Sequence, residues 1–281
     1  MRVSPVSRNL LRLLALALLA AAVGGCSLFN RGKSTDPQDT LPVEQLYERG
    51  VQMLDAGNYA SAARSFARLI ARFPFGAYTE QSQINVAYAL YKDNKPEEAY
   101  SAINRFIKTY PTHKHIDYAF YLRGLINFNR AGGLLERYAG LDMTRRSQVN
   151  LRQSFDDFNA LVSRYPQSRY AADARLRMVY LRNLMAQSEL NIALYYFKRD
   201  AFVASANRGK EIVETYPGSP QVADALAIMA RSYRALGQDA LADDAQRVLQ
   251  LNYPDHASFK GKWPKYPSNW WKLVPFYGRG G

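Results

Sequence analysis

Few side chains in this sequence of 281 residues are suited to chemistry. It contains one cysteine, Cys26, and three histidines, His113, His115 and His256. His113 and His115 are two positions apart, so on a helix they would not face each other. His113 follows Pro111 and Thr112 at a plausible helix start, where a structural role is favoured over a ligand role. His256 stands alone.

Acidic residues provide no catalytic group either. Asp156 and Asp157 are adjacent and are expected to be solvated, and no partner is evident for Asp142, Asp200, Asp243 or Asp244. There is no HExxH, no GxSxG, no cysteine pair and no glycine-rich phosphate loop, which are the patterns that bring metal, nucleophilic or phosphate chemistry. We therefore expect no enzyme, no metal and no cofactor other than a covalent lipid on Cys26.

Cys26 is the residue with a clear chemical context. The first twelve residues carry three arginines and no acid, Leu13 to Val23 is an unbroken apolar run, and Val23-Gly24-Gly25 precede the cysteine. The run is too short for a membrane-spanning helix but suits a secretory signal. The whole pattern resembles a bacterial lipobox, which implies that residues 1–25 are a signal peptide and that Cys26 is acylated. The alternative is an ordinary signal peptide with an incidental cysteine.

Residues 26–42 are polar and interrupted by Gly32, Pro37 and Pro42, a composition typical of a flexible tether between a lipid and a folded domain. Residue 27 is serine, which in lipoproteins of this type implies the outer membrane. Because Cys26 is the only cysteine, no disulfide can stabilise the domain, and its stability must come from its apolar core.

The domain that follows contains a repeated helix ending. An aromatic residue precedes proline five times, at Phe73-Pro74, Tyr110-Pro111, Tyr165-Pro166, Tyr216-Pro217 and Tyr253-Pro254. Each pair ends an amphipathic stretch, and proline cannot continue a helix. The prolines are 37, 55, 51 and 37 positions apart by these numbers, close to or longer than the roughly 34 residues of a tetratricopeptide (TPR) repeat. The fold class predicted is an all-α solenoid of five TPR-like repeats.

We assign repeats one and two to residues 43–111 and repeats three to five to residues 112–254. In repeat one, Gly50 and Ala62 occupy the positions where paired helices approach closely, and Gly57 lies in the turn. In repeat three, Gly124 corresponds to Gly50. Such arrays usually bind other proteins.

Repeats three and four contain the additional residues. The segment 130–146 is longer than a TPR turn; a binding loop is favoured, with a tolerated insertion as the alternative. Residues 170–199 contain no glycine or proline, so they predict one helix of nearly twice the usual length.

The tail, residues 255–281, differs in composition from the repeats. It holds all three tryptophans and several lysines, and its prolines argue against a helix. Such an irregular extension would suit a cap on the last repeat or disorder. The other interpretation is a contact with a membrane interface or a partner groove.

The net charge of +13 becomes +10 once the three signal-peptide arginines are removed (13 − 3 = 10). The bases are dispersed along the helices, as at Arg64, Arg68, Arg72, Arg175 and Arg177, and no nucleic-acid-binding motif accompanies them. We therefore expect no nucleic acid as a partner and favour anionic lipid surfaces or acidic proteins.

Three stretches carry a family resemblance. They are Arg72-Phe73-Pro74-Phe75-Gly76 with Tyr78 and Gln81; Pro111-Thr112-His113 with Ile116-Asp117-Tyr118, Tyr121 and Arg123-Gly124-Leu125; and Phe155, Asp157 and Phe158 with Tyr165-Pro166. Together with the lipobox and the repeats, they resemble the competence-type TPR lipoproteins of the outer-membrane β-barrel assembly machinery, the BamD family, over about residues 20 to 254.

The resemblance implies a protein anchored by lipid to the periplasmic face of the outer membrane. Its implied partners are a β-barrel insertase with periplasmic repeat domains, accessory lipoproteins and unfolded outer-membrane proteins recognised by a C-terminal signal strand. The Trp-rich tail departs from the family's commonest members, which leaves the accessory lipoproteins expected near repeat five in doubt.

The resemblance also suggests site residues. Phe73 and Gly76 match positions implicated in substrate contact, and Phe75 and Tyr78 accompany them in the same stretch. We expect Arg123 or nearby bases to bind the terminal carboxylate of the substrate. A separate partner-binding site is implied at Asn207 and Arg208, of which Arg208 matches an arginine implicated in coupling to the insertase.

Two rival functions remain open. One is a TPR lipoprotein that scaffolds cell-wall or competence machinery, which co-purification would distinguish. The other is an adaptor that binds nucleic acid through its basic surface, which would show a steep dependence of affinity on salt.

Overall fold

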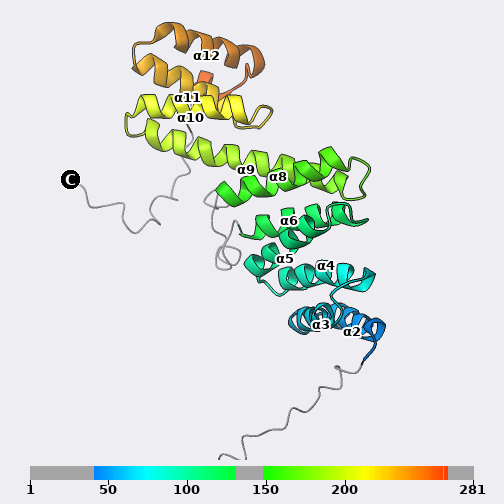
Figure 1. Ribbon diagram of the computed structural model, residues 1–281. Coiled ribbons are helices and arrows are strands. Elements are labelled where there is room, and N and C mark those ends of the chain that lie inside the picture. The colour runs from blue at the N-terminus through cyan, green and yellow to red at the C-terminus, as the bar shows by residue number, and fades with distance from the viewer. Residues whose placement is uncertain (1–40, 131–147, 262, 265–281) are drawn as a thin grey trace, which may run out of the picture.

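The computed structural model describes residues 41–130, 148–261, 263 and 264. Within these ranges its regular structure is entirely helical, as the sequence predicts (Figure 1). The elements are α2 (Val43–Asp55), α3 (Tyr59–Arg72), α4 (Ala77–Lys92), α5 (Pro96–Thr109), α6 (Ile116–Arg130), α8 (Gln148–Arg164), α9 (Ala171–Phe197), α10 (Phe202–Thr215), α11 (Val222–Ala235), α12 (Asp239–Asn252) and the 3₁₀ helix η4 (Ala257–Lys260). Among the helices of these ranges, none has the length and apolar character needed to cross a membrane.

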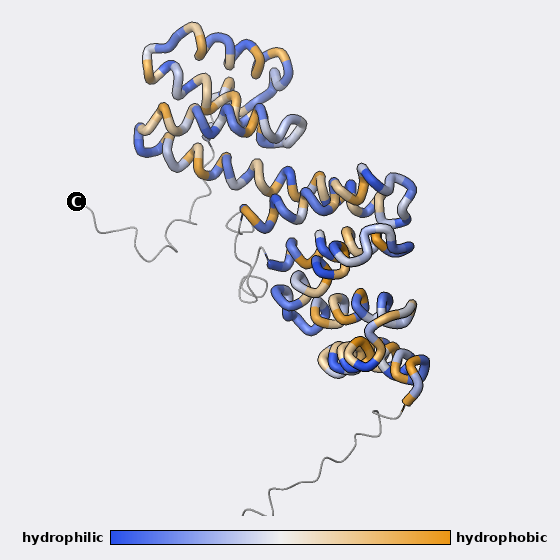
Figure 2. The backbone as a smooth tube through the Cα atoms, viewed as in Figure 1, coloured by the Kyte–Doolittle hydropathy of each residue, from blue (hydrophilic) through white to orange (hydrophobic). Residues whose placement is uncertain are grey.

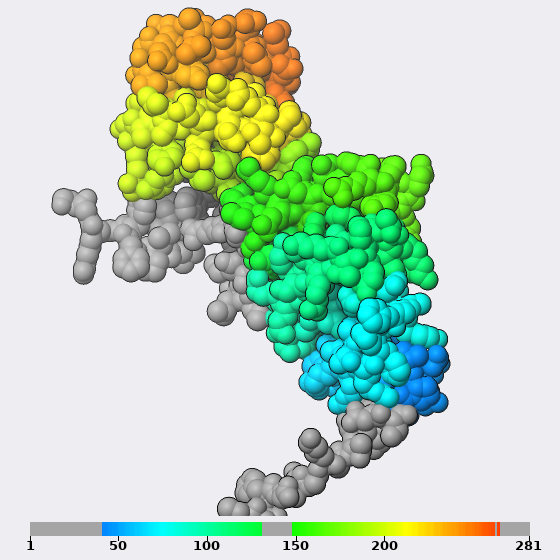
Figure 3. All heavy atoms as spheres, viewed as in Figure 1, coloured from blue at the N-terminus to red at the C-terminus, as the bar shows by residue number. Residues whose placement is uncertain are grey.

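The helices pair as α2–α3, α4–α5, α6–α8, α9–α10 and α11–α12, and each pair packs on the next. Figures 1 and 3 show the five pairs stacked into one elongated array, and Figure 2 shows apolar positions on every helix of the stack. The predicted TPR-like architecture is therefore confirmed. The predicted signal peptide, Cys26, most of the tether, residues 131–147 and residues 265–281 lie outside the described residues.

All five aromatic-proline pairs end a helix. In each case the last helical residue is the one before the aromatic residue. The amide of the aromatic residue still donates to the carbonyl oxygen four residues earlier. The amide of Phe73 is 2.8 Å from the Leu69 oxygen, and that of Tyr253 is 2.8 Å from the Leu249 oxygen. The following proline has no amide to extend the ladder, so the chain turns into the next repeat.

Glycine permits close packing within two of the pairs. A Cβ atom added to Gly50 would lie 2.6 Å from Cε1 of Phe66, and one added to Gly124 would lie 2.6 Å from Cε1 of Phe158. Both phenylalanines are completely or almost completely buried. The two helices of repeat one and of repeat three are thus joined by the same arrangement, an aromatic ring lying directly on a glycine.

The long helix predicted in repeat four is present. α9 has 27 residues and packs against α8 on one side and against α10 and α11 on the other. The largest apolar cluster, which runs from Ile84 to Ala225, therefore continues through four repeats without interruption. A separate small cluster joins repeat one to repeat two and is formed by Ala62, Ala63 and Phe66 of α3 and Ala89 of α4.

The first residues of the tail cover the last repeat. Trp263 is buried against α11, its indole Nε1 donates to the carboxylate of Asp224, and its carbonyl oxygen accepts from Nη1 of Arg231 at 2.8 Å. The guanidinium carbon of Arg231 also lies 5.1 Å from the centre of the Trp263 ring. For this part of the tail the structure agrees with the capping alternative.

Candidate functional site

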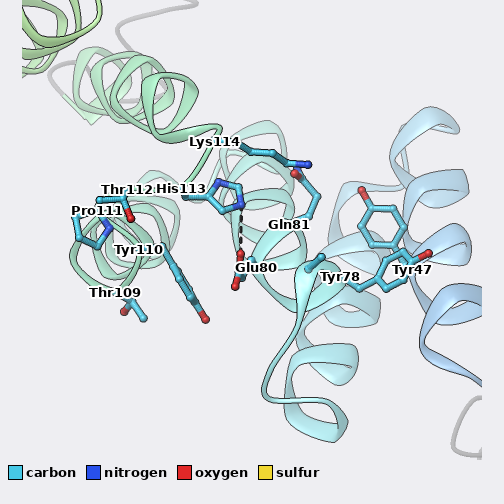
Figure 4. A pocket seen from close by; sticks show the side chains of 11 residues that line it. Tyr47, Tyr78, Glu80, Gln81, Thr109, Tyr110, Pro111, Thr112, His113 and Lys114 are labelled. Atoms are coloured by element: carbon cyan, nitrogen blue, oxygen red, sulfur yellow. Dashed lines mark ion pairs between the residues drawn. The ribbon is translucent and has the colours of Figure 1, made fainter.

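A groove of about 780 Å³ lies at the junction of repeats one and two. It is lined by Tyr47 of α2, by the first turns of α4 and by residues 109–114, which end α5 and lead into α6. Figure 4 shows Tyr47 and Tyr78 on one side of the groove, with Tyr110 and His113 across from them. The groove therefore lies where the chain turns between helices, next to the beginning of α4.

Aromatic packing positions the first wall. The ring centres of Tyr47 and Tyr78 are 5.2 Å apart, and Tyr47 also lies 5.8 Å from Phe66 in the core of repeat one. Tyr78 is oriented by the turn before α4, where Gly76 has a φ of 109° and the hydroxyl of Thr79 donates to the Phe73 oxygen. A side chain is rarely compatible with that φ, so glycine is required for the turn.

The opposite wall is built around His113. Its ring meets Phe106 edge-on at 5.2 Å, and its Nε2 lies 3.5 Å from Oε2 of Glu80. Burial lowers the pKa of His113, an effect that the Glu80 carboxylate partly opposes. His113 and His115 lie between α5 and α6 and not on a helix, so the condition of the sequence argument is not met, and their rings are 5.5 Å apart.

The groove is lined by one base, Lys114, and one acid, Glu80, which lies beside His113. Lys114 is exposed and lines the groove, and α4 begins there at Ala77. The first amides of a helix have no intrahelical acceptor and carry a partial positive charge. A carboxylate could be bound here while the tyrosine wall contacts an apolar or aromatic side chain. In the described residues no group of three or more His, Cys, Asp or Glu side chains is arranged to hold a metal.

Of the four predicted substrate residues in the 73–78 stretch, only Tyr78 lines the groove. Phe73 is half-buried, with the Arg72 guanidinium 5.0 Å from its ring centre, and Gly76 forms the turn. Phe75 is 88% exposed and contributes nothing to the lining. Of this stretch, the structure therefore places only the Tyr78 side chain at the groove.

Arg123 is not at the groove. Its Nη1 donates to Asn104 at 2.9 Å and its Nη2 lies 2.5 Å from Oδ1 of Asp157 on α8. Asp157 is only 5% exposed and also accepts from Asn127 at 2.7 Å. The expectation that Asp157 is solvated is therefore wrong, because it is the internal partner of Arg123, whereas Asp156 is exposed.

The two predicted partner-binding residues lie on α10, in repeat four. Arg208 is half-exposed and its Nη1 lies 2.9 Å from Oε2 of Glu189 on α9, while Asn207 is exposed. They are separated from the groove by repeat three (Figure 1). Two acids expected to lack partners have them, since Asp243 pairs with Arg234 at 2.7 Å and Asp244 with Arg247 at 2.8 Å.

Sequence reasoning missed Tyr47, Tyr110 and Lys114 as groove residues. The sequence identifies Tyr110 only as an aromatic residue that ends a helix. Tyr47 lies 31 residues before Tyr78, so the proximity of these two side chains depends on how α2 packs on α4. One signal was available. The turn 110–115 holds two histidines and a lysine and has no acid, which is an unusual concentration of groups that can carry positive charge.

Comparison with known proteins gives a consistent result. A family model described as "Outer membrane lipoprotein" (YfiO) matches residues 39–249. A curated relative from Xylella fastidiosa (strain 9a5c), named outer membrane protein assembly factor BamD, is 47% identical over 94% of this chain and 90% of its own length. A relative of the same name from Neisseria meningitidis serogroup B is 38% identical over 92% of this chain and 96% of its own length.

Among solved structures, the TPR2AB domain of yeast Sti1 in complex with pHSP90 aligns with 76% of this chain and 79% of its own. The identity is 13% and the TM-score is 0.42.

Proposed function

The chain belongs to the outer membrane lipoprotein family that includes the BamD assembly factors, and from this membership we propose that it is a non-enzymatic subunit of an outer-membrane protein assembly complex. In this proposal it is held at the periplasmic face by lipid on Cys26, scaffolds a β-barrel insertase and accessory lipoproteins, and receives unfolded outer-membrane proteins. The observation that supports substrate reception best is the groove between repeats one and two.

The groove is suited to the end of an extended chain. Its tyrosine wall offers apolar contact to an aromatic side chain, and Lys114 with the first turn of α4 offers charge to a terminal carboxylate. We assign the carboxylate to Lys114 and not to Arg123, since Arg123 already pairs with the buried Asp157. The substrate contacts proposed are thus Tyr47, Tyr78 and Lys114.

Peptide binding tests this assignment. A peptide with a C-terminal aromatic residue should bind the mature chain, and amidation of its carboxyl end should weaken binding. Lys114→Glu should lower the affinity about tenfold, as loss of a charge-assisted hydrogen bond would. Lys210→Glu, on exposed α10, is the charge-matched control and should bind normally. Equal affinity of the free and amidated peptides would remove Lys114 from the site.

Arg208 and Asn207 are proposed as the surface that couples to the insertase. The array would then bind substrate at one end and contact the insertase through repeat four, where Arg208 pairs with Glu189. Affinity purification from gently solubilised membranes tests this proposal. We expect a large β-barrel protein with periplasmic repeat domains to co-purify with the wild type and to be lost with Arg208→Ala but not with Arg247→Ala. Recovery of only cell-wall enzymes or DNA-uptake components would refute the assembly role.

A further inference from the structure

α3 carries an unusual row of charge. Arg64, Arg68 and Arg72 are spaced four residues apart, so they follow one side of the helix, and α3 is the only α-helix of the described ranges without an acidic residue. We call these three residues the arginine row. The opposite end of the array differs, because α12 holds three aspartates and one arginine. Within repeat one the net positive charge is confined to α3, since α2 holds three acids and one arginine, and in the arginine row Arg64 is exposed while Arg68 and Arg72 are half-buried.

Phe75 lies three residues after Arg72, the last residue of the arginine row. It lies in the turn after α3 and, at 88%, is the most exposed large apolar side chain of the described residues. A single exposed apolar residue needs no explanation, but Phe75 lies beside a row of cations, outside the groove. Bases next to an exposed aromatic side chain are typical of proteins that bind the interfacial region of a membrane.

The chain enters the folded array at the same place. Nη1 of Arg72 donates to the carbonyl oxygen of Leu41 at 3.1 Å, so the first residues of the folded part are held against the end of the arginine row. Only fifteen positions separate Leu41 from Cys26, and fifteen residues span at most about 50 Å. An acyl chain on Cys26 would therefore keep this end of the array near the bilayer, at high effective concentration.

We propose that the arginine row and Phe75 form a second, non-covalent membrane contact that binds an anionic lipid surface. This inference rests on the lipid anchor of the proposed function for its setting. The arginines supply attraction to acidic headgroups, and Phe75 enters the interfacial region. Two contacts, the acyl group and this surface, fix the orientation of repeat one relative to the bilayer, which a single flexible attachment would leave free.

Vesicle binding without the acyl chain is the direct test. The mature chain from residue 26, carrying Cys26→Ser, is floated with vesicles that contain phosphatidylglycerol and with vesicles of phosphatidylcholine alone. We expect binding to the first, weakened by added salt, and little to the second. A base near an anionic surface contributes about a fivefold factor, so Arg64→Glu with Arg68→Glu should lower the partition coefficient by at least about tenfold. Phe75→Ser should lower it about fivefold. Arg72 is left intact because it holds Leu41.

The matched control reverses two exposed bases at the far end, Arg247→Glu with Lys260→Glu, and should leave binding unchanged. Equal losses of vesicle binding in both double variants would show that binding depends only on net charge, and would overturn the proposal. So would loss of binding on deletion of residues 265–281 without any effect of the α3 changes.

The same variants in the peptide assay separate the two proposals. Phe75→Ser should leave peptide affinity unchanged while weakening vesicle binding. The reverse result would return Phe75 to the substrate site and overturn the lipid assignment. Absence of any peptide binding would refute the groove and leave the vesicle result standing.

Discussion

Arg123 and Asp157 form an ion pair across the interface of α6 and α8, with Nε 2.7 Å and Nη2 2.5 Å from the same carboxylate oxygen. Asn127 donates to the second oxygen, and the arginine side chain lies over Phe120, its guanidinium carbon 5.2 Å from the ring centre. Burial raises the pKa of Asp157, although Arg123 and Asn127 counteract this. The pair fixes how the two helices of repeat three face each other.

Arg123→Ala should destabilise the chain, because Asp157 would remain buried without its cation. Removing one partner of a buried ion pair typically costs about 3 kcal/mol. Denaturant unfolding measures the change, with Arg105→Ala, an exposed residue of α5, as control. Unchanged stability together with a large loss of peptide affinity would favour a direct substrate role for Arg123.

The loss of stability caused by Arg123→Ala should depend on pH. A carboxyl group whose pKa is raised on folding stabilises the folded state below its unfolded pKa, and this contribution is lost as pH rises through the folded pKa. Without Arg123 the pKa of Asp157 rises further, so the variant should differ most from the wild type near neutral pH and least in acid. A stability difference that is constant with pH would show that Asp157 is not the cause.

Gly124→Ala should overpack repeat three, since its new Cβ would lie 2.6 Å from the Phe158 ring. Inserting one methyl group in a tight core costs about 1 to 3 kcal/mol. Phe158→Leu should itself destabilise, but the double variant should be more stable than the sum of the two changes predicts. Strict additivity in thermal or denaturant unfolding would mean that glycine and ring do not interact.

His113→Gln should make stability less sensitive to acid. The folded pKa of His113 is lowered, so its stabilising contribution is present above about 6.5, the unfolded pKa, and is lost as pH falls through the folded value. The wild type should therefore lose more stability than the variant on acidification from neutral pH. His115→Gln removes one of the groups that lower the pKa of His113, so it should reduce the acid sensitivity by less than His113→Gln does.

Trp263→Ala should loosen the last repeat. The change removes a buried indole from the cluster that includes Leu226, Ile228 and Leu249, and it removes the donor to Asp224. Truncation of a buried aromatic residue costs about 3 kcal/mol or more. Hydrogen exchange of α11 and α12 reports the effect, and Phe259→Ala, at an exposed position, should leave exchange unchanged.

The fold was largely predictable from sequence because its signals are local. A proline ends a helix wherever it occurs, so the pairs Phe73-Pro74 and Tyr253-Pro254 predict helix ends without any tertiary information. The same holds for α9, whose length follows from the absence of breakers. Asp157 was misjudged because burial and pairing with Arg123 depend on the neighbouring helix, which a pattern within one segment does not reveal.

The groove was only partly predictable for the same reason. Tyr78 and the turn at Gly76 belong to a motif that can be identified in sequence. Tyr47 and Lys114 come from other segments, and only the packing of α2 and α5 on α4 brings them to Tyr78. The side chains near one turn also differ in direction, so that Phe75 and Tyr78, three positions apart, lie on different surfaces.

The separate apolar cluster of repeat one, around Phe66, implies a gradient of local unfolding along the array. The largest cluster runs through repeats two to four and reaches repeat five at Ala225, whereas α2 contributes no buried residue to it and packs only against the small cluster around Phe66, so α2 should open at a lower free energy than the middle of the array. Tyr47 would move with α2. The groove would thus have one wall on α2, outside the largest cluster, and would widen to admit chains of different sequence without disturbing the end that holds Arg208.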